Sequence, residues 1–167
     1  DRVFSEVGGL AQQMLTPAGQ LLTLQEAARR VQGGLSAWKG LADKPELLQE
    51  ALRLIDECKT CAVAPETLFA AAEESEDAVL AEKLSDLAQI LTAYERLCEE
   101  SLPDPRDRLT HLRDRLAESH TLDGAAVYLD GFLGFTVQES AVVDAMLAAG
   151  VPLSAAVTCD TDYPEIF

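Results

Sequence analysis

The sequence of 167 residues lacks several features that would place it quickly in a functional class. No apolar run approaches the roughly 20 residues of a membrane-spanning helix, so we expect no membrane partner. Residues 1–4 do not resemble a signal peptide, because no basic region precedes an apolar one. The chain also starts in the middle of a helical pattern without a methionine, and we therefore expect a fragment of a longer protein.

The chain has little positive charge, with 13 basic residues against 29 acidic residues and a net charge of −16. No Lys or Arg follows Arg115, while the region after residue 122 contains further acidic residues. Such a charge repels the phosphate backbone of nucleic acids. We therefore expect this chain by itself to bind DNA only weakly.

Aromatic residues are scarce at 5%, and the cysteines are Cys58, Cys61, Cys98 and Cys159. Cys58 and Cys61 have C-x-x-C spacing, but no second pair and no pair of histidines accompanies them. A zinc site needs four ligands, so this spacing alone does not indicate one. We expect reduced cysteines, no metal site in this chain and a cytoplasmic protein.

Apolar residues at spacings of three and four predict helices over most of residues 1–122. The strongest pattern covers residues 77–100, and its apolar positions are Leu80, Leu84, Leu87, Leu91, Tyr94 and Cys98. A helix with one narrow apolar stripe needs partner helices. Residues 1–122 are therefore predicted to form a helical bundle.

From residue 123 onwards the pattern changes to short apolar runs bounded by glycine. Strands are predicted over residues 125–130 and 153–158, with a helix over residues 137–149 between them. Thr136 and Glu139 have the spacing of a capping box at the start of that helix. Strand, helix and strand in about 35 residues predict a right-handed βαβ unit with parallel strands. The fold class is thus mainly α with a small α/β part, divided into residues 1–122 and 123–167.

The first predicted strand ends in an acidic residue, Asp130, and Gly131 follows it. In P-loop NTPases an aspartate after a strand, in the Walker B position, holds Mg²⁺. Asp130 is therefore the candidate nucleotide-binding residue. Gly131 cannot supply the glutamate that orients the attacking water, and the chain has no G-x-x-x-x-G-K-[ST] loop, so we predict no catalytic residue. In the structural alternative, Asp130 accepts hydrogen bonds from backbone N–H groups around Gly131.

Basic residues gather in one predicted helical region, at Arg106, Arg108, Arg113 and Arg115. They could form a basic contact surface. Because Asp107 and Asp114 are interleaved with them, a solvated helix with salt bridges is the favoured interpretation.

Residues 129–139 read Leu-Asp-Gly-Phe-Leu-Gly-Phe-Thr-Val-Gln-Glu. This segment resembles the D-G-F-x-x-F-T-x-Q-E signature of the AddB (RexB) family, the B subunits of bacterial AddAB (RexAB) ATP-dependent helicase/deoxyribonucleases. The signature residues are Asp130, Gly131, Phe132, Phe135, Thr136, Gln138 and Glu139. Residues 2–9, 16–19, 64–68, 83–88 and 94–95 are similar to further landmarks of that family, in the same order.

The resemblance implies a fragment of the N-terminal helicase-like region of AddB, comprising a helical insertion subdomain and part of a motor domain that has lost its motor function. It places Asp130 at the first position of the D-E-F-Q-D motif of related helicases, where Gly131 replaces the glutamate. It also implies end processing of broken DNA for recombinational repair, with an AddA-like subunit as the partner. ATP, Mg²⁺, DNA and an iron–sulfur cluster are implied for the full-length protein or its complex, and none of the cysteines here is assigned to that cluster.

Three functions stay open on the sequence alone. The first is a non-catalytic fragment with an architectural or DNA-presenting role. The second is a nucleotide-binding ATPase fragment that uses Asp130 for Mg²⁺, which requires a G-x-x-x-x-G-K-[ST] loop elsewhere in the full-length chain. The third is an unrelated acidic helical module that binds protein partners.

Overall fold

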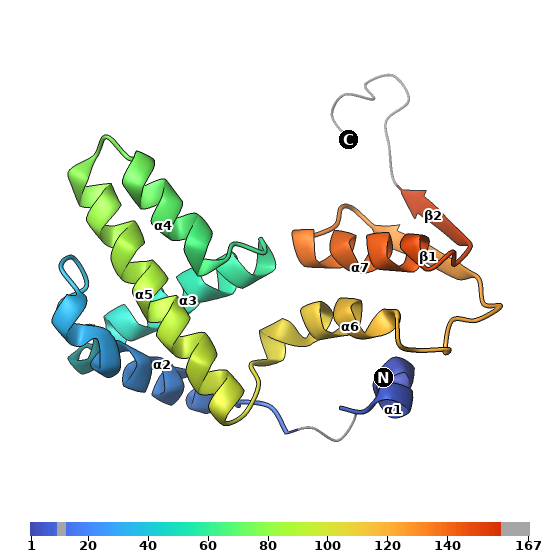
Figure 1. Ribbon diagram of the computed structural model, residues 1–167, viewed down its shortest axis with the longest axis horizontal. Helices are drawn as coiled ribbons and strands as arrows, with labels where there is room; N and C mark the ends of the chain where they lie inside the picture. Colours follow the sequence, from blue (N-terminus) through green and yellow to red (C-terminus); the bar gives the residue numbers. More distant parts are fainter. Residues whose placement is uncertain (10–12, 158–167) are drawn as a thin grey trace. The chain divides into compact units, whose positions relative to one another are not determined.

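The computed structural model describes residues 1–9 and 13–157 (Figure 1). It is mainly helical and has a small parallel sheet, which confirms the predicted fold class. The chain divides into two compact units, residues 13–107 and residues 1–12 with 108–167. Within the described ranges, no helix combines the length and the apolar character needed to cross a membrane.

Residues 13–107 form a helical bundle. Its elements are α2 (Pro17–Val31), η1 (Gln32–Gly34), η2 (Leu41–Asp43), α3 (Pro45–Thr60), α4 (Pro65–Glu74), α5 (Ala78–Glu100) and η3 (Pro105–Asp107). Proline opens α2, α3 and α4, at a position where no intrahelical N–H bond is lost. The side chain of Thr16 caps α2 by accepting a hydrogen bond from Gly19 N at 3.1 Å. Asp77 caps α5 in the same way, accepting from Val79 N at 2.9 Å and from Leu80 N at 3.2 Å.

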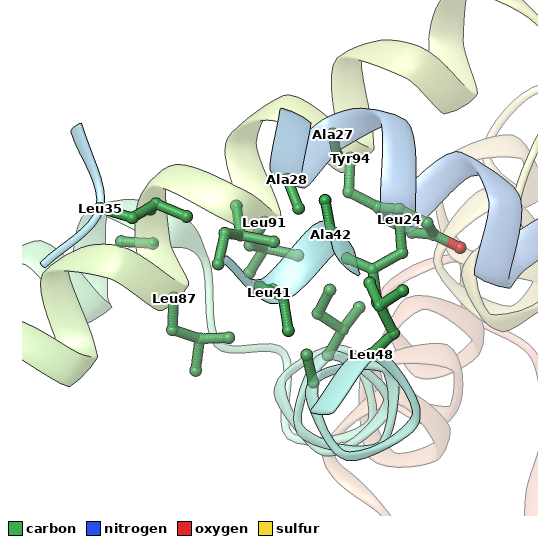
Figure 2. Close-up of a cluster of buried hydrophobic side chains, with 14 of the residues drawn as sticks. Leu24, Ala27, Ala28, Leu35, Leu41, Ala42, Leu48, Leu87, Leu91 and Tyr94 are labelled. Carbon is green, nitrogen blue, oxygen red and sulfur yellow. The ribbon is translucent and has the colours of Figure 1, made fainter. Parts of the chain in front are cut away.

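The helix α5 packs against both α4 and α2 (Figure 1). Its predicted apolar stripe is buried from Leu87 onwards, whereas Leu80 in the first turns is exposed. Figure 2 shows Leu91 and Tyr94 among side chains contributed by α2, η2 and α3. Full burial of one leucine contributes about 1.5–3 kcal/mol, so this cluster accounts for much of the stability of the bundle.

The second unit contains the strands. Its elements are α1 (Arg2–Val7), α6 (Arg108–Leu116), β1 (Val127–Phe132), α7 (Val137–Ala148) and β2 (Leu153–Val157). The strands are parallel, as predicted, and pair Val127 with Leu153. The helix α6 packs against α1 and α7, around a small core of Val3, Leu116 and Val142.

Both predicted bounds of the first strand, 125–130, are wrong. The strand starts at Val127, because Ala125 N donates to Leu122 O in a preceding turn. It continues past Asp130 to Phe132, which pairs with Val157 after a shift in register. The predicted helix over 137–149 agrees with α7 to within one residue, and the predicted strand end at Thr158 lies outside the described residues.

The compact units differ from the predicted division at residue 122. The helix α6, which the prediction grouped with the bundle, packs on α7 in the unit that holds the strands. The compact units of a structure need not coincide with evolutionary domains. The domain boundary predicted at residue 122 therefore stays a prediction.

Candidate functional site

Asp130 lies inside β1 rather than at its end. Its side chain is exposed, and its carboxylate has no hydrogen bond or ion pair within residues 1–9 and 13–157. The structural alternative, in which the carboxylate accepts backbone N–H groups around Gly131, is therefore not observed. A role for Asp130 in holding Mg²⁺ in the full-length protein stays a prediction.

Gly131 has a φ of 79°, in the left-handed region that glycine adopts easily. The register of the sheet shifts between Leu129 and Phe132, so Asp130 and Gly131 form a bulge-like irregularity. A Cβ atom at residue 131 would meet no atom within 4 Å, and the cost of a side chain comes from the backbone alone. A glutamate at residue 131 would therefore destabilise this left-handed backbone conformation by roughly 1–2 kcal/mol.

The signature residues after the strand build the turn into α7. Thr136 Oγ1 accepts a hydrogen bond from Glu139 N at 3.2 Å, and the Glu139 carboxylate accepts one from Thr136 N at 2.8 Å. This reciprocal pair confirms the predicted capping box. The rings of Phe132 and Phe135 stack with their centroids 4.9 Å apart, which fixes the loop between them.

Gln138 connects this turn to a neighbouring helix. Its Nε2 lies 3.2 Å from Oγ1 of Thr110, which belongs to α6. Together with the capping box and the stacked rings, this contact gives the signature side chains after Gly131 a role in shaping the β1–α7 turn. None of these contacts requires a bound ligand.

The residues present do not by themselves fit a nucleotide with its metal ion. Asp130 is a single oxygen ligand, and the chain has no phosphate-binding loop. The described residues contain no group of three or more His, Cys, Asp or Glu side chains that could hold a metal ion. Burial is the main cause that raises the pKa of the Cys58 and Cys98 thiols, to about 11 for Cys98. The raised pKa values disfavour the thiolate forms that bind metals. Cys159 lies outside the described residues.

A buried carboxylate that the sequence did not reveal lies in the bundle. Asp104 is 1% exposed, and its Oδ1 accepts hydrogen bonds from Gln20 Nε2 at 2.8 Å and from Arg106 N at 3.0 Å. Its Oδ2 accepts a hydrogen bond from the Tyr94 hydroxyl at 2.8 Å. The sequence around it, Pro103-Asp104-Pro105, predicted a break in one helix and a cap for the next, but not a buried carboxylate. The available signal for the cap was an acidic residue between two prolines. The prolines restrict the backbone on both sides, and the Asp104 carboxylate can then accept a hydrogen bond at the start of η3.

An ion pair lies next to this buried carboxylate. Lys59 Nζ lies 2.6 Å and 2.7 Å from the two carboxylate oxygens of Asp107, and 5.9 Å from the centroid of the Tyr94 ring. Burial, followed by the charge of Asp104, raises the pKa of the Tyr94 hydroxyl, which stays a donor throughout the physiological range. The two carboxylates therefore join α2, α3 and α5 to residues 102–107, and their role is to stabilise the bundle.

Three of the four arginines near α6 have acidic partners, and the fourth, Arg115, donates to the backbone carbonyl of Val7 at 2.8 Å. Arg108 pairs with Asp1, Arg113 pairs with Asp114, and Arg106 pairs with Asp56. These ion pairs support the interpretation of a salt-bridged helix over that of a basic contact surface.

Glu6 on α1 fixes the segment that follows α6. Its carboxylate accepts hydrogen bonds from Ser119 Oγ at 2.6 Å, Thr121 Oγ1 at 2.7 Å and His120 N at 2.9 Å. These hydrogen bonds lower the pKa of Glu6 to about 2, and the bond from Ser119 has the largest effect. Among the residues that the structure describes, the His120 side chain pairs with Asp123 at the surface. These hydrogen bonds thus hold residues 119–121, which precede β1, against α1.

Comparison with known proteins identifies relatives along nearly the whole chain. The family model described as "ADDB, N-terminal" matches residues 1–166. The B subunit of the ATP-dependent helicase/deoxyribonuclease of Desulforudis audaxviator is 37% identical over 163 residues, covering 95% of this chain and 14% of the relative. The protein of the same name from Moorella thermoacetica is 34% identical over 164 residues, with 95% of this chain and 14% of the relative covered.

A third relative of that name, from Thermoanaerobacter sp. (strain X514), is 30% identical over 166 residues, which is 99% of this chain and 14% of the relative. The chain therefore spans about one seventh of the length of these relatives. The match of the family model extends through the helical bundle as well as the β1–α7 turn that carries the signature residues. The chain belongs to the AddB N-terminal family.

Proposed function

We propose that this chain is a non-catalytic, architectural part of the B subunit of a bacterial ATP-dependent helicase/deoxyribonuclease. In this proposal the subunit works with an AddA-like partner on the ends of broken DNA, in the cytoplasm, during recombinational repair. The chain helps to present DNA to the complex without contributing a catalytic side chain. ATP, Mg²⁺ and an iron–sulfur cluster, where the protein uses them, depend on residues outside this chain.

The observation that carries the proposal is the backbone at Gly131. The left-handed φ of 79° follows directly after the acidic residue, at the position where the resemblance places the glutamate of working motors. The side chains that follow are engaged in the capping box, the stacked rings and the contact of Gln138 with Thr110. The segment is thus organised as a turn that positions α7 against α6.

The negative charge of the chain supports an indirect role toward DNA. A net charge of −16 disfavours contact with phosphates, and three of the four arginines near α6, namely Arg106, Arg108 and Arg113, already have acidic partners. The proposal therefore assigns direct DNA contacts to other parts of the complex.

The ATPase alternative is favoured by one observation, the exposure of the unpartnered Asp130 carboxylate, and a binding experiment separates the two functions. The full-length B subunit is prepared as wild type, as Asp130→Asn and as Asp144→Asn, a matched control at an exposed acidic residue of α7. The affinity of each for a non-hydrolysable ATP analogue with Mg²⁺ is measured by titration calorimetry.

The architectural proposal predicts that Asp130→Asn and Asp144→Asn leave the affinity for nucleotide within about twofold of wild type. Loss of a metal ligand would instead weaken binding by roughly tenfold or more for Asp130→Asn alone. That result would contradict the proposal and support the alternative in which Asp130 holds Mg²⁺ with a bound nucleotide.

A further inference from the structure

One face of α5 is hollowed where residues of α4, η1 and α2 adjoin it. Two concavities of about 360 Å³ and about 400 Å³ lie along it and share Phe69 and Gln89 in their linings. The helix contributes side chains at helical spacing, namely Glu82, Asp86, Gln89, Thr92, Ala93 and Arg96. We call this surface the α5 groove. Its ends, Glu82 and Arg96, are separated by about 21 Å along the helix.

The end of the groove near the start of α5 is acidic. Glu73, Glu82 and Asp86 line it, and none of the three has an ion pair in the part of the chain that the structure describes. Asp86 is buried, and its Oδ2 is fixed by hydrogen bonds from Ser36 N at 2.8 Å and Trp38 N at 2.9 Å. Asp86 lines the concavity, and both of its hydrogen bonds found among the described residues go to Oδ2, which leaves Oδ1 without one. A buried, immobilised carboxylate with an open oxygen is suited to receive a cation.

The opposite end of the groove is basic. Arg30 and Arg96 line it, and Arg96 has no ion pair within the described residues. Arg30 pairs with Glu26 at 3.1 Å and with Glu100 at 3.6 Å. Exposed pairs of this kind contribute only about 0–1 kcal/mol, so a ligand carboxylate can exchange with them.

The middle of the groove has apolar surface beside the Gln89 side chain. Phe69 is 37% exposed and lies in both linings, next to the small side chains of Ala72 and Ala93. This surface fits aliphatic side chains, or the aliphatic stems of long charged ones.

We propose that the α5 groove binds a polypeptide segment of the partner subunit that carries a basic side chain at one end and an acidic side chain at the other. The basic side chain contacts Asp86 and Glu82, and the acidic side chain contacts Arg96. The inference rests on the proposed function, because it takes the occupant from the complex described there.

The opposed charges decide between classes of ligand. A nucleic acid carries one sign of charge, so a strand with phosphates at Arg96 would place other phosphates against the three carboxylates. A polypeptide can satisfy both ends. If the segment is helical, its two charged residues are about 14 positions apart, and if it is extended they are about six apart.

Site-specific crosslinking in the full-length complex tests the inference. A photoreactive amino acid replaces Phe69, and in a control protein it replaces Leu47, a residue of α3 outside the groove that is similarly exposed, at 40%. After irradiation, crosslinked peptides are identified by mass spectrometry. The expected product joins residue 69 to one segment of the partner subunit with the stated charge pattern, at several times the yield obtained from residue 47.

The charge requirement is tested by Arg96→Glu, with Arg53→Glu as the control on the exposed side of α3. We expect Arg96→Glu to lower the crosslinking yield from residue 69 by about tenfold, and Arg53→Glu to leave it unchanged. An undiminished yield with Arg96→Glu overturns the inference, as do crosslinks only to the same subunit, only to DNA, or to nothing. In these cases the proposed function stands if the two subunits still associate. If they do not associate, both fail.

Discussion

The buried carboxylate of Asp104 allows a sharp test of how the bundle is held together. Replacing Tyr94 by phenylalanine keeps the ring in the core and removes only the hydroxyl that donates to Asp104 Oδ2 at 2.8 Å. A hydrogen bond to a charged group contributes about 1.5–3 kcal/mol, and this carboxylate, at 1% exposure, has no solvent to replace the donor. We therefore expect Tyr94→Phe to lower the free energy of unfolding by about 2 kcal/mol.

Replacing Asp104 itself has a larger expected effect. Asp104→Ala leaves Gln20 and the Tyr94 hydroxyl without their acceptor and removes the carboxylate that caps η3. Breaking a buried charged network in this way costs about 3–5 kcal/mol. Since a domain of this size has about 5–15 kcal/mol of stability, the variant should lose a substantial fraction of it and unfold at a clearly lower urea concentration.

Urea denaturation measures both effects. The single tryptophan, Trp38, lies in the same unit as Asp104, so its fluorescence reports on the bundle. Tyr128→Phe, at a residue that is 78% exposed in the other unit, is the matched control and should change stability by less than about 0.5 kcal/mol. A loss below about 0.5 kcal/mol for Tyr94→Phe would refute the reasoning, as would independent, additive effects of Tyr94→Phe and Asp104→Asn in a double-mutant cycle.

Three further predictions concern other parts of the fold. The pKa of Glu6, about 2 against 4.5 for the free side chain, gives a stabilisation that is complete above pH 4.5 and is lost as the pH falls toward 2. Glu6→Gln should therefore flatten the acid limb of a stability profile measured by circular dichroism, and an unchanged acid limb would contradict this. Leu91→Ala, in the centre of the bundle core, should cost about 2–5 kcal/mol in urea denaturation, and a loss below about 1 kcal/mol would place Leu91 outside the core. Thr136→Ala removes one half of the capping box and should cost about 1 kcal/mol with faster amide exchange at the start of α7, whereas unchanged exchange would show that the cap is dispensable.

Local sequence signals predicted the helices well, because their causes are local. Thr136 with Glu139 forms the predicted capping box at the start of α7. Apolar spacing along α5 similarly predicted the burial of its stripe from Leu87 to Cys98, although Ala88 and Ile90, outside that stripe, are buried as well. These signals depend on neighbours within about four residues, which a sequence shows directly.

Features that depend on distant contacts were missed. The burial of Asp104 follows from Gln20, 84 residues away in sequence, and no local pattern indicates that contact. The course of β1 through Asp130 depends on its pairing with β2 and on the φ of Gly131, so a prediction from apolar runs ended the strand too early. The grouping of α6 with α7 was also not visible, because an apolar stripe does not identify the surface it packs against.

The central claim is that Asp130 and its turn contribute shape rather than chemistry to the complete enzyme. The most direct measurement is the rate of ATP-dependent processing of linear duplex DNA by the full two-subunit complex, with either Asp130→Asn or Asp104→Ala in the B subunit. We expect the complex with Asp130→Asn to process DNA at the wild-type rate, while Asp104→Ala, which damages the scaffold, lowers the yield of assembled, active complex. A loss of about tenfold or more with Asp130→Asn in a complex that assembles normally would contradict the claim.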